Sequence, residues 1–180
     1  MLFSFFATSL AGCYEIRPKV SADHRGKFVK LFHSDEFQDR GLVHIYNHVD
    51  YTIARKGMIK GLHFHPPPHS NVLLVTVIKG SMLNVVVDLR KKSSSFHNVY
   101  STSMNDSDGS MLYIPEGFAH GFLSLEDNSV LLSLSDKTHE SIERHGVNWA
   151  SIDYKWPIER PIVSEEDQRL VPLSDCVSPF

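Results

Sequence analysis

Hydrophobic and polar positions alternate in short runs along most of the chain, and turn residues separate the runs at fairly regular intervals. Alternating runs rich in β-branched and aromatic residues indicate strands. Beyond residue 42 the pattern predicts eight of them: Val43–Ile53, Met58–Phe64, Val72–Ile78, Met82–Asp88, Asn98–Ser103, Met111–Ile114, His120–Leu125 and Val130–Leu134. A series of short strands of this kind is typical of an all-β sandwich or barrel.

The two ends of the chain follow other patterns. Residues 1–18 predict one or two further strands, and residues 19–27 form a polar turn region that leads into the apolar run Phe28–Phe32. Two short helices, each with a serine as its N-cap, are predicted at Ser34–Asp39 and Ser164–Arg169. After Asp136 the alternation stops, so we expect the C-terminal tail to wrap the barrel or a partner subunit.

Length and composition set the class of protein. The 180 residues, 42% hydrophobic and 22% charged, fit one domain over residues 1–180. The formal charge of −3, with scattered basic residues, argues against nucleic acid as a partner. Only two cysteines, Cys13 and Cys176, are present, which fits a reducing compartment such as the cytoplasm.

The apolar start of the chain has the outline of an export signal, because Leu10–Cys13 matches the shape of a lipoprotein cleavage site. However, no Lys or Arg precedes the apolar run, and Ser4, Thr8 and Ser9 interrupt it. No later stretch approaches the roughly 20 apolar residues of a membrane span. We therefore predict a cytoplasmic protein with no membrane partner.

Histidines supply the candidate chemistry. His63 and His65 lie two residues apart on a predicted strand, so their side chains share one face. The run Pro66–Pro68 must end that strand, which places the pair near a barrel mouth, and His69 and His120 are further candidates. Convergent neutral imidazoles suit a divalent metal, whereas a single imidazole suits general base catalysis, and spacing leaves both open.

Several motifs together carry a resemblance. They occur in order as Arg25–Phe28, Lys56–His63, Val86–Arg90, Ile114–Phe122 and Trp156–Pro157. This series resembles the dTDP-4-dehydrorhamnose 3,5-epimerase family of cupins over roughly residues 8 to 173. The resemblance implies an all-β fold, a double-stranded β-helix or cupin jelly-roll barrel with short peripheral helices.

The resemblance also implies an activity. Such enzymes work without a metal cofactor on nucleotide-linked 4-keto-6-deoxy sugars, used in bacterial surface polysaccharides, and a histidine removes the proton at C3 or C5. His63 matches this base, and His65 and His120 are further candidates for catalysis. Arg25 and Lys60 match residues that meet the diphosphate. The remaining residues expected to bind substrate are His48, Asp50, Tyr51 and Phe122.

This sequence departs from the family pattern at several positions. Leu132 falls where the family has a tyrosine acid, Leu73 where it has a lysine for the enolate oxygen, and Ser151 where an orienting aspartate is expected. Other departures are Lys30 for a glutamate, His65 and His48 for glutamines, and Asp50 for an asparagine. We therefore predict a divergent member that lacks the usual tyrosine, lysine and aspartate.

These departures leave four functional alternatives. The first is an epimerase in which His65, His120, Tyr51 or water returns the proton. The second is a 3,4-ketoisomerase, because such cupins also carry an HxH pair and move protons along one face. The third is a metal-dependent cupin enzyme that binds a divalent first-row metal through His63, His65, His69 and His120. The fourth is a catalytically silent relative that binds a nucleotide sugar or serves as an assembly partner.

The resemblance further implies a homodimer in which N-terminal strands pair across the interface and help to cover the neighbour's site. Phe3, Phe5 and Phe6 would be buried in that arrangement.

Overall fold

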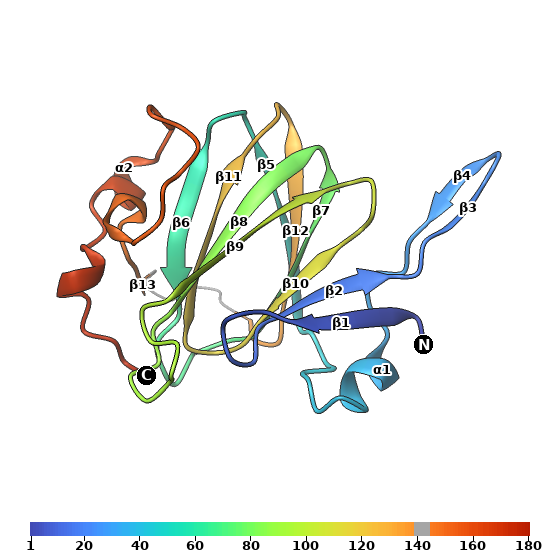
Figure 1. The fold of residues 1–180 in the computed structure, drawn as a ribbon, viewed down its shortest axis with the longest axis horizontal. Coiled ribbons are helices and arrows are strands. Elements are labelled where there is room, and N and C mark those ends of the chain that lie inside the picture. The colour runs from blue at the N-terminus through green and yellow to red at the C-terminus, as the bar shows by residue number, and fades with distance from the viewer. Residues whose placement is uncertain (139–144) are drawn as a thin grey trace.

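A computed structural model describes residues 1–138 and 145–180 of the protein. Two antiparallel sheets pack face to face (Figure 1). The six-stranded sheet has the order β1 (Phe3–Ala7), β2 (Tyr14–Pro18), β10 (Met111–Ile114), β7 (Leu73–Lys79), β12 (Ser129–Ser135) and β5 (His48–Ala54). The five-stranded sheet has the order β13 (His145–Gly146), β6 (Ile59–Phe64), β11 (Phe118–Ser124), β8 (Ser81–Asp88) and β9 (Val99–Asn105).

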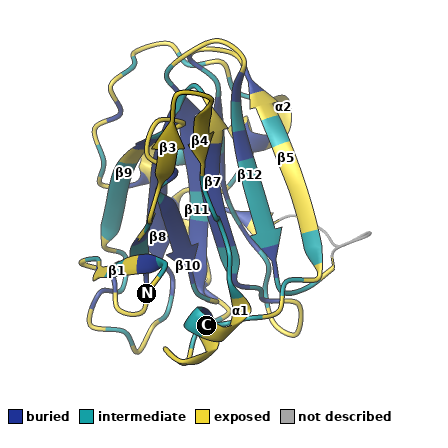
Figure 2. Cartoon of the chain, turned by 90° about the vertical axis from the view of Figure 1, so that its right-hand side faces the viewer, coloured by how far each residue is buried: buried dark blue, intermediate teal, exposed yellow. Residues whose placement is uncertain are grey.

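Smaller elements flank the sheets. A separate hairpin of β3 (Ser21–Asp23) and β4 (Gly26–Phe28) projects from the body of the molecule, and all of its residues are exposed (Figures 1 and 2). The short helices are α1 (Ser34–Gln38), η1 (Trp149–Ser151), α2 (Glu165–Gln168) and η2 (Leu173–Asp175). None of the described helices has the length and apolar content of a membrane-crossing segment.

The core lies between the two sheets, and further buried clusters lie outside them. Inward side chains of both sheets, among them Val75, Val86 and Phe118, form one buried cluster. A second cluster covers the outer face of the five-stranded sheet, where Trp156 and Leu173 of the C-terminal tail pack against Ile59 and Leu62 of β6. This packing brings α2 close to β6, which positions one residue of the functional site.

Most predicted strands are present with ends shifted by one or two residues, and β10 has the bounds that were predicted. Three predictions are wrong. Residues 43–47 precede β5, because its ladder with β12 begins at His48 opposite Ser135. The polar region 19–27 contains the hairpin strands. Ser34 is the first residue of α1, whose N-cap is His33 without a side-chain hydrogen bond.

The N-terminal phenylalanines find partners within the same chain. Phe3 is 2% exposed and packs edge-on against Phe37 of α1, as does Phe5. Phe6 is 47% exposed, with the guanidinium of Arg17 lying 5.1 Å from its ring centroid. Phe3 is therefore buried without a partner subunit, whereas Phe6 leaves apolar surface open.

Candidate active site

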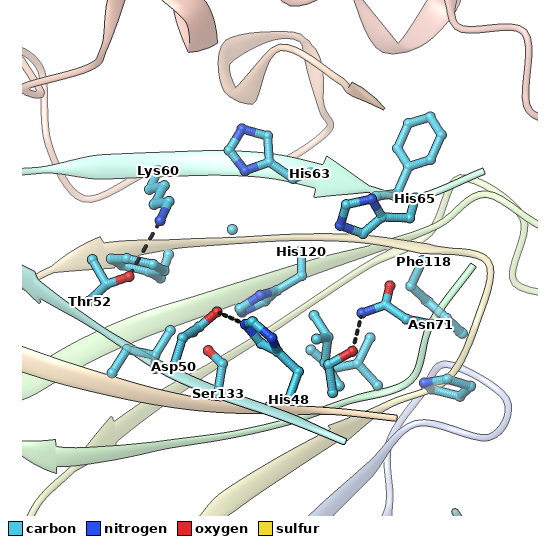
Figure 3. A pocket seen from close by; sticks show the side chains of 18 residues that line it. His48, Asp50, Thr52, Lys60, His63, His65, Asn71, Phe118, His120 and Ser133 are labelled. Carbon is cyan, nitrogen blue, oxygen red and sulfur yellow. Dashed lines mark hydrogen bonds and ion pairs between the residues drawn. The ribbon is translucent and has the colours of Figure 1, made fainter. Parts of the chain in front are cut away.

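A cavity of about 240 Å³ lies between the two sheets, where β5 and β6 face each other (Figure 3). Side chains from both sheets and from the loop after β6 line it: His48, Asp50, Thr52, Lys60, His63, Phe64, His65, Asn71, Leu73, Ile114, Pro115, Phe118, His120, Gly121, Phe122, Leu131, Ser133 and Ser135. The lining combines an apolar base with imidazole, carboxylate, amide and ammonium groups. Such a mixture is typical of small-molecule sites.

Lys60 and His63 are cavity residues of β6, and a bulge sets their spacing. His63 pairs with His120 of β11, but Phe122 pairs with Lys60, so one extra residue of β6 lies between the two pairs. Lys60 therefore lines the cavity together with His63 and His65, although strict alternation would separate residues 60 and 63. Gly61 makes the bulge, with a φ of +106° and an ideal Cβ position only 2.7 Å from the carbonyl oxygen of His120.

His63 lines the cavity and forms a hydrogen bond with Asp167 of α2. Its Nε2 is 2.6 Å from Oδ1 of Asp167, and the other carboxylate oxygen accepts a hydrogen bond of 2.9 Å from the amide of Gly61. Ser164 caps α2 as predicted, since its hydroxyl accepts a hydrogen bond of 3.1 Å from the amide of Asp167. The bulge and the capped helix together hold the carboxylate against the imidazole.

The environment of Asp167 keeps it ionised. Burial raises the pKa of this carboxyl, but the hydrogen bonds from His63 and from the amide of Gly61 outweigh it and hold the pKa below its usual value. An ionised carboxylate only accepts, so Nε2 of His63 carries a proton and Nδ1 of the neutral ring carries the lone pair. The pair thus orients an imidazole whose Nδ1 is left available to accept a proton.

His120 occupies the centre of the cavity wall and stays neutral. Its Nε2 lies 3.1 Å from Oδ1 of Asn84, whose amide nitrogen donates to the sulfur of Met104. Burial, with smaller contributions from the charges of His63 and Lys60, lowers the pKa of His120 to about 3. His120 therefore accepts no proton at neutral pH and serves as a fixed polar group of the wall.

This shift predicts how stability depends on pH. A histidine in the unfolded chain has a pKa of about 6.5, so the unfolded state binds a proton at a higher pH than the folded state does. The free energy of unfolding is therefore highest above pH 6.5 and falls as the pH drops toward 3. Since His120 keeps some exposure to the cavity, we expect about 1 kcal/mol of this loss between pH 7 and pH 5. Urea unfolding at both pH values should show a smaller pH difference for His120→Gln than for the native protein. An equal difference in both proteins would contradict the shift.

The opposite wall belongs to β5 and its neighbour β12. His48, Asp50 and Thr52 of β5 line the cavity, and the hydroxyl of Thr52 accepts a hydrogen bond of 3.3 Å from the ammonium group of Lys60 across the cavity (Figure 3). Tyr51 points the other way, because strand alternation leaves its side chain outside the cavity and 65% exposed. The expectation that Tyr51 contacts substrate or returns a proton is therefore wrong for this chain on its own.

Two other predicted residues lie away from the cavity. Arg25 is on the projecting hairpin, where its side chain is 79% exposed and forms an ion pair of 2.6 Å with Asp23. His69 is exposed beside a separate hollow formed with Asn47, Asp136 and Lys137. The predicted ligand set of His63, His65, His69 and His120 is thus not brought together, and the described residues contain no group of three side chains suited to hold a metal ion.

The structure changes the interpretation of two departures from the family pattern, those at Ser151 and Leu132. Asp167 supplies the carboxylate partner of His63, so the prediction that this aspartate is lost at Ser151 is wrong. Ser151 lies in η1, where its hydroxyl donates to the carbonyl of Asn148 and accepts from the amide of Leu173. On β12 the cavity-lining side chain is Leu131, whereas Leu132 does not line the cavity, because positions 131, 133 and 135 share the inward face.

Sequence reasoning missed several residues of the site. Asp167 is 104 residues from His63 in the chain, and its capped helix was predicted without any sign of its partner. Asn71 donates a hydrogen bond of 2.9 Å to the hydroxyl of Ser135, and Ser133 lines the same wall. Alternation along Val130–Leu134 could have indicated the serines, since they share a face with Leu131.

Comparison with known proteins decides the family. The model of the dTDP-4-dehydrorhamnose 3,5-epimerase family matches residues 7–175. The chain belongs to this family. It is an isomerase of the dTDP-4-dehydrorhamnose 3,5-epimerase kind, and its reaction is the epimerisation of a dTDP-linked 4-keto-6-deoxy sugar at C3 and C5 or at C3.

Three relatives of this epimerase cover most of the chain. A dTDP-4-dehydrorhamnose 3,5-epimerase of Methanothermobacter thermautotrophicus is 34% identical and matches 96% of each chain. A dTDP-4-dehydrorhamnose 3-epimerase of Streptomyces niveus is 30% identical, over 93% of this chain and 82% of its own. The crystal structure of the Bacillus anthracis 3,5-epimerase with TDP and PPi bound is 28% identical, with a TM-score of 0.91 over 95% of this chain and 99% of its own. The cupin jelly roll predicted from the sequence is thereby confirmed.

Proposed function

We propose that His63 is the base of this epimerase and that Asp167 orients it. The observation that carries the proposal is the hydrogen bond of 2.6 Å between His63 Nε2 and the Asp167 carboxylate. A carboxylate in this position fixes the tautomer of the ring and stabilises the imidazolium that forms when Nδ1 takes a proton. The pair therefore has the two properties that removal of a carbon-bound proton requires.

The substrate's keto group makes this chemistry feasible. A carbonyl at C4 acidifies the hydrogens at C3 and C5, because the electron pair left at carbon moves onto the carbonyl oxygen as an enolate. Lys60 supplies positive charge on the same wall as His63, so it meets the negative charge that the substrate brings in its diphosphate or develops at the enolate oxygen. We assign the proton to be removed to C3, C5 or both.

We infer that this chain is a divergent epimerase. Leu73 and Leu131 line the cavity at or next to the positions where the resemblance places the family's lysine and tyrosine. Two leucines make this part of the wall apolar, so neither can donate a proton or neutralise an oxyanion. Of the family's tyrosine, lysine and aspartate, only the aspartate has a counterpart near His63, which is Asp167.

The proposed function is tested by its product. Proton NMR of dTDP-4-keto-6-deoxyglucose incubated with the purified protein should show new signals whose coupling constants report inversion at C3, at C5 or at both. A ketoisomerase would instead move the carbonyl to C3. A silent relative would bind the nucleotide sugar and return it unchanged.

The proposed enzyme is a homodimer in which Arg25 reaches the neighbouring site. The hairpin β3–β4 projects from the body of the molecule (Figure 1). None of its residues lines the cavity of its own chain, and Arg25 at its turn is exposed. The outward residues of edge strand β5, namely Val49, Tyr51 and Ile53, are between 59% and 65% exposed (Figure 2). A second copy would cover apolar surface of this kind.

Replacement of Arg25 tests this arrangement. We expect light scattering to give about twice the chain mass of 20.4 kDa. Arg25→Ala should raise KM about 10- to 100-fold with kcat nearly unchanged, because a charge-assisted hydrogen bond to the diphosphate would be lost from substrate and transition state alike. Lys155→Ala, an exposed change in the C-terminal tail, is the control and should leave KM unaltered. A monomer, or a normal KM for Arg25→Ala, would contradict the dimer site.

A further inference from the structure

A second histidine and carboxylate pair lies across the cavity from His63 and Asp167. Nε2 of His48 is 3.2 Å from Oδ2 of Asp50, and both side chains line the cavity (Figure 3). His48 belongs to β5 of the six-stranded sheet, whereas His63 belongs to β6 of the five-stranded sheet. A sugar between the sheets would therefore present one face to each pair.

We propose that His48, held by Asp50, is the acid that returns the proton on the face of the sugar opposite His63. This inference rests on the proposed epimerisation and adds its second catalytic residue. Inversion at carbon needs two groups, because a proton returned by the base that removed it restores the starting configuration. The wall opposite His63 must therefore supply or relay a proton.

The architecture of β5 and β12 presents His48 to the cavity. Alternation along β5 turns His48 and Asp50 inward, and the ladder with β12 sets Ser135 opposite His48 and Ser133 opposite Asp50. Serine side chains are short, so they leave space in front of the pair. His48 is 38% exposed, which permits exchange of its proton with water between turnovers.

The chemistry of the wall points to the same residue. Besides this pair, the described residues that line it on β5, β7 and β12 are Thr52, Leu73, Leu131, Ser133 and Ser135. Leucines carry no proton to give, and aliphatic hydroxyls are far too weakly acidic to protonate an enolate efficiently at neutral pH. An imidazole is a common general acid, and the Asp50 carboxylate orients the His48 ring by accepting a hydrogen bond from its Nε2. His48 is thus the acid that this wall offers.

The two steps balance. Nδ1 of His63 takes the proton from C3 or C5, the C–H electron pair forms a C=C bond, and the carbonyl π pair becomes the enolate lone pair. The enolate then re-forms the carbonyl while the carbon takes a proton from the Nδ1–H of the His48 imidazolium on the other face. His63 releases its proton to water and neutral His48 regains one, so the reaction needs no oxidant or reductant.

The test separates removal of the proton from its return. In deuterated water with dTDP-4-keto-6-deoxyglucose, His48→Gln should still exchange deuterium into recovered substrate at a rate within about threefold of the native protein. Formation of the epimer should fall by about 100-fold or more, the usual contribution of a general acid. Asp50→Asn should reduce epimer formation less and leave exchange intact, as expected for a positioning residue.

The control and the contrary outcomes are distinct. Val177→Thr changes an outward residue of the C-terminal tail, 87% exposed, and should alter neither rate. Normal epimer formation by His48→Gln would overturn the proposal, and so would an equal fall in exchange and epimer formation, which would mark a binding role. Neither exchange nor epimer with the native protein would instead refute the proposed function itself.

Discussion

His63→Asn is expected to lower kcat/KM by about 10³-fold or more, because the variant keeps a polar group near Asp167 but loses the base. Asp167→Asn should lower it less, by about 10- to 100-fold, since the imidazole remains but its tautomer is no longer enforced. Both values come from initial rates of epimer formation. The larger loss of kcat/KM should belong to His63→Asn, because loss of the base removes the reacting group whereas loss of its partner only disturbs the orientation of that group.

A matched histidine variant gives this prediction its control. His69→Asn changes an exposed histidine outside the cavity, so activity should be unaltered. If His69→Asn lost as much activity as His63→Asn, the result would favour the alternative in which His63, His65, His69 and His120 bind a metal. Activity of His63→Asn within tenfold of the native protein would show that another group removes the proton.

Gly61→Ala is expected to cost more than about 3 kcal/mol of unfolding free energy and to abolish activity. The new Cβ would lie 2.7 Å from the carbonyl oxygen of His120 and 2.9 Å from Cα of Gly121, both backbone atoms that cannot rotate away. The residue also holds a φ of +106°, which costs a residue with a Cβ additional energy. Relief of the clash would separate β6 from β11 and displace both His63 and the amide that binds Asp167.

A second glycine separates the two causes. Gly41 has a φ of +67°, but a Cβ added there would meet nothing within 4 Å. Gly41→Ala should therefore cost only about 1 kcal/mol and leave activity unchanged, and urea denaturation measures both variants. Equal costs for the two substitutions would mean that the contact between β6 and β11 does not decide the effect.

The strand pattern predicted much of this fold because alternation reports which face of a strand is buried. Met111–Ile114 was predicted on other grounds, since this continuous apolar run of four residues, all buried, is bounded by turn residues. The hairpin at Ser21–Phe28 escaped prediction, because its exposed residues carry no apolar face and no buried contact that a pattern could reveal.

Site residues that lie close together on one strand could be predicted from the sequence. Residues brought together from distant segments of the chain could not. The spacing of His63 and His65 placed both at one cavity, and His120 pairs directly with His63. Asp167 could not be assigned, because a four-residue capped helix carries no sign of what its side chains contact after the tail folds over the outer sheet. Leu131, Ser133 and Ser135 share the inward face of β12, and only the phase of the folded strand fixes which face that is.

The central claim is that His63 removes a proton beside the keto group. Proton NMR of dTDP-4-keto-6-deoxyglucose in deuterated water tests it most directly, with native protein and His63→Asn side by side. We predict deuterium at C3, C5 or both with the native protein, and none above the enzyme-free rate with the variant. Deuterium entering at the same rate with both proteins would contradict the assignment of His63 as the base.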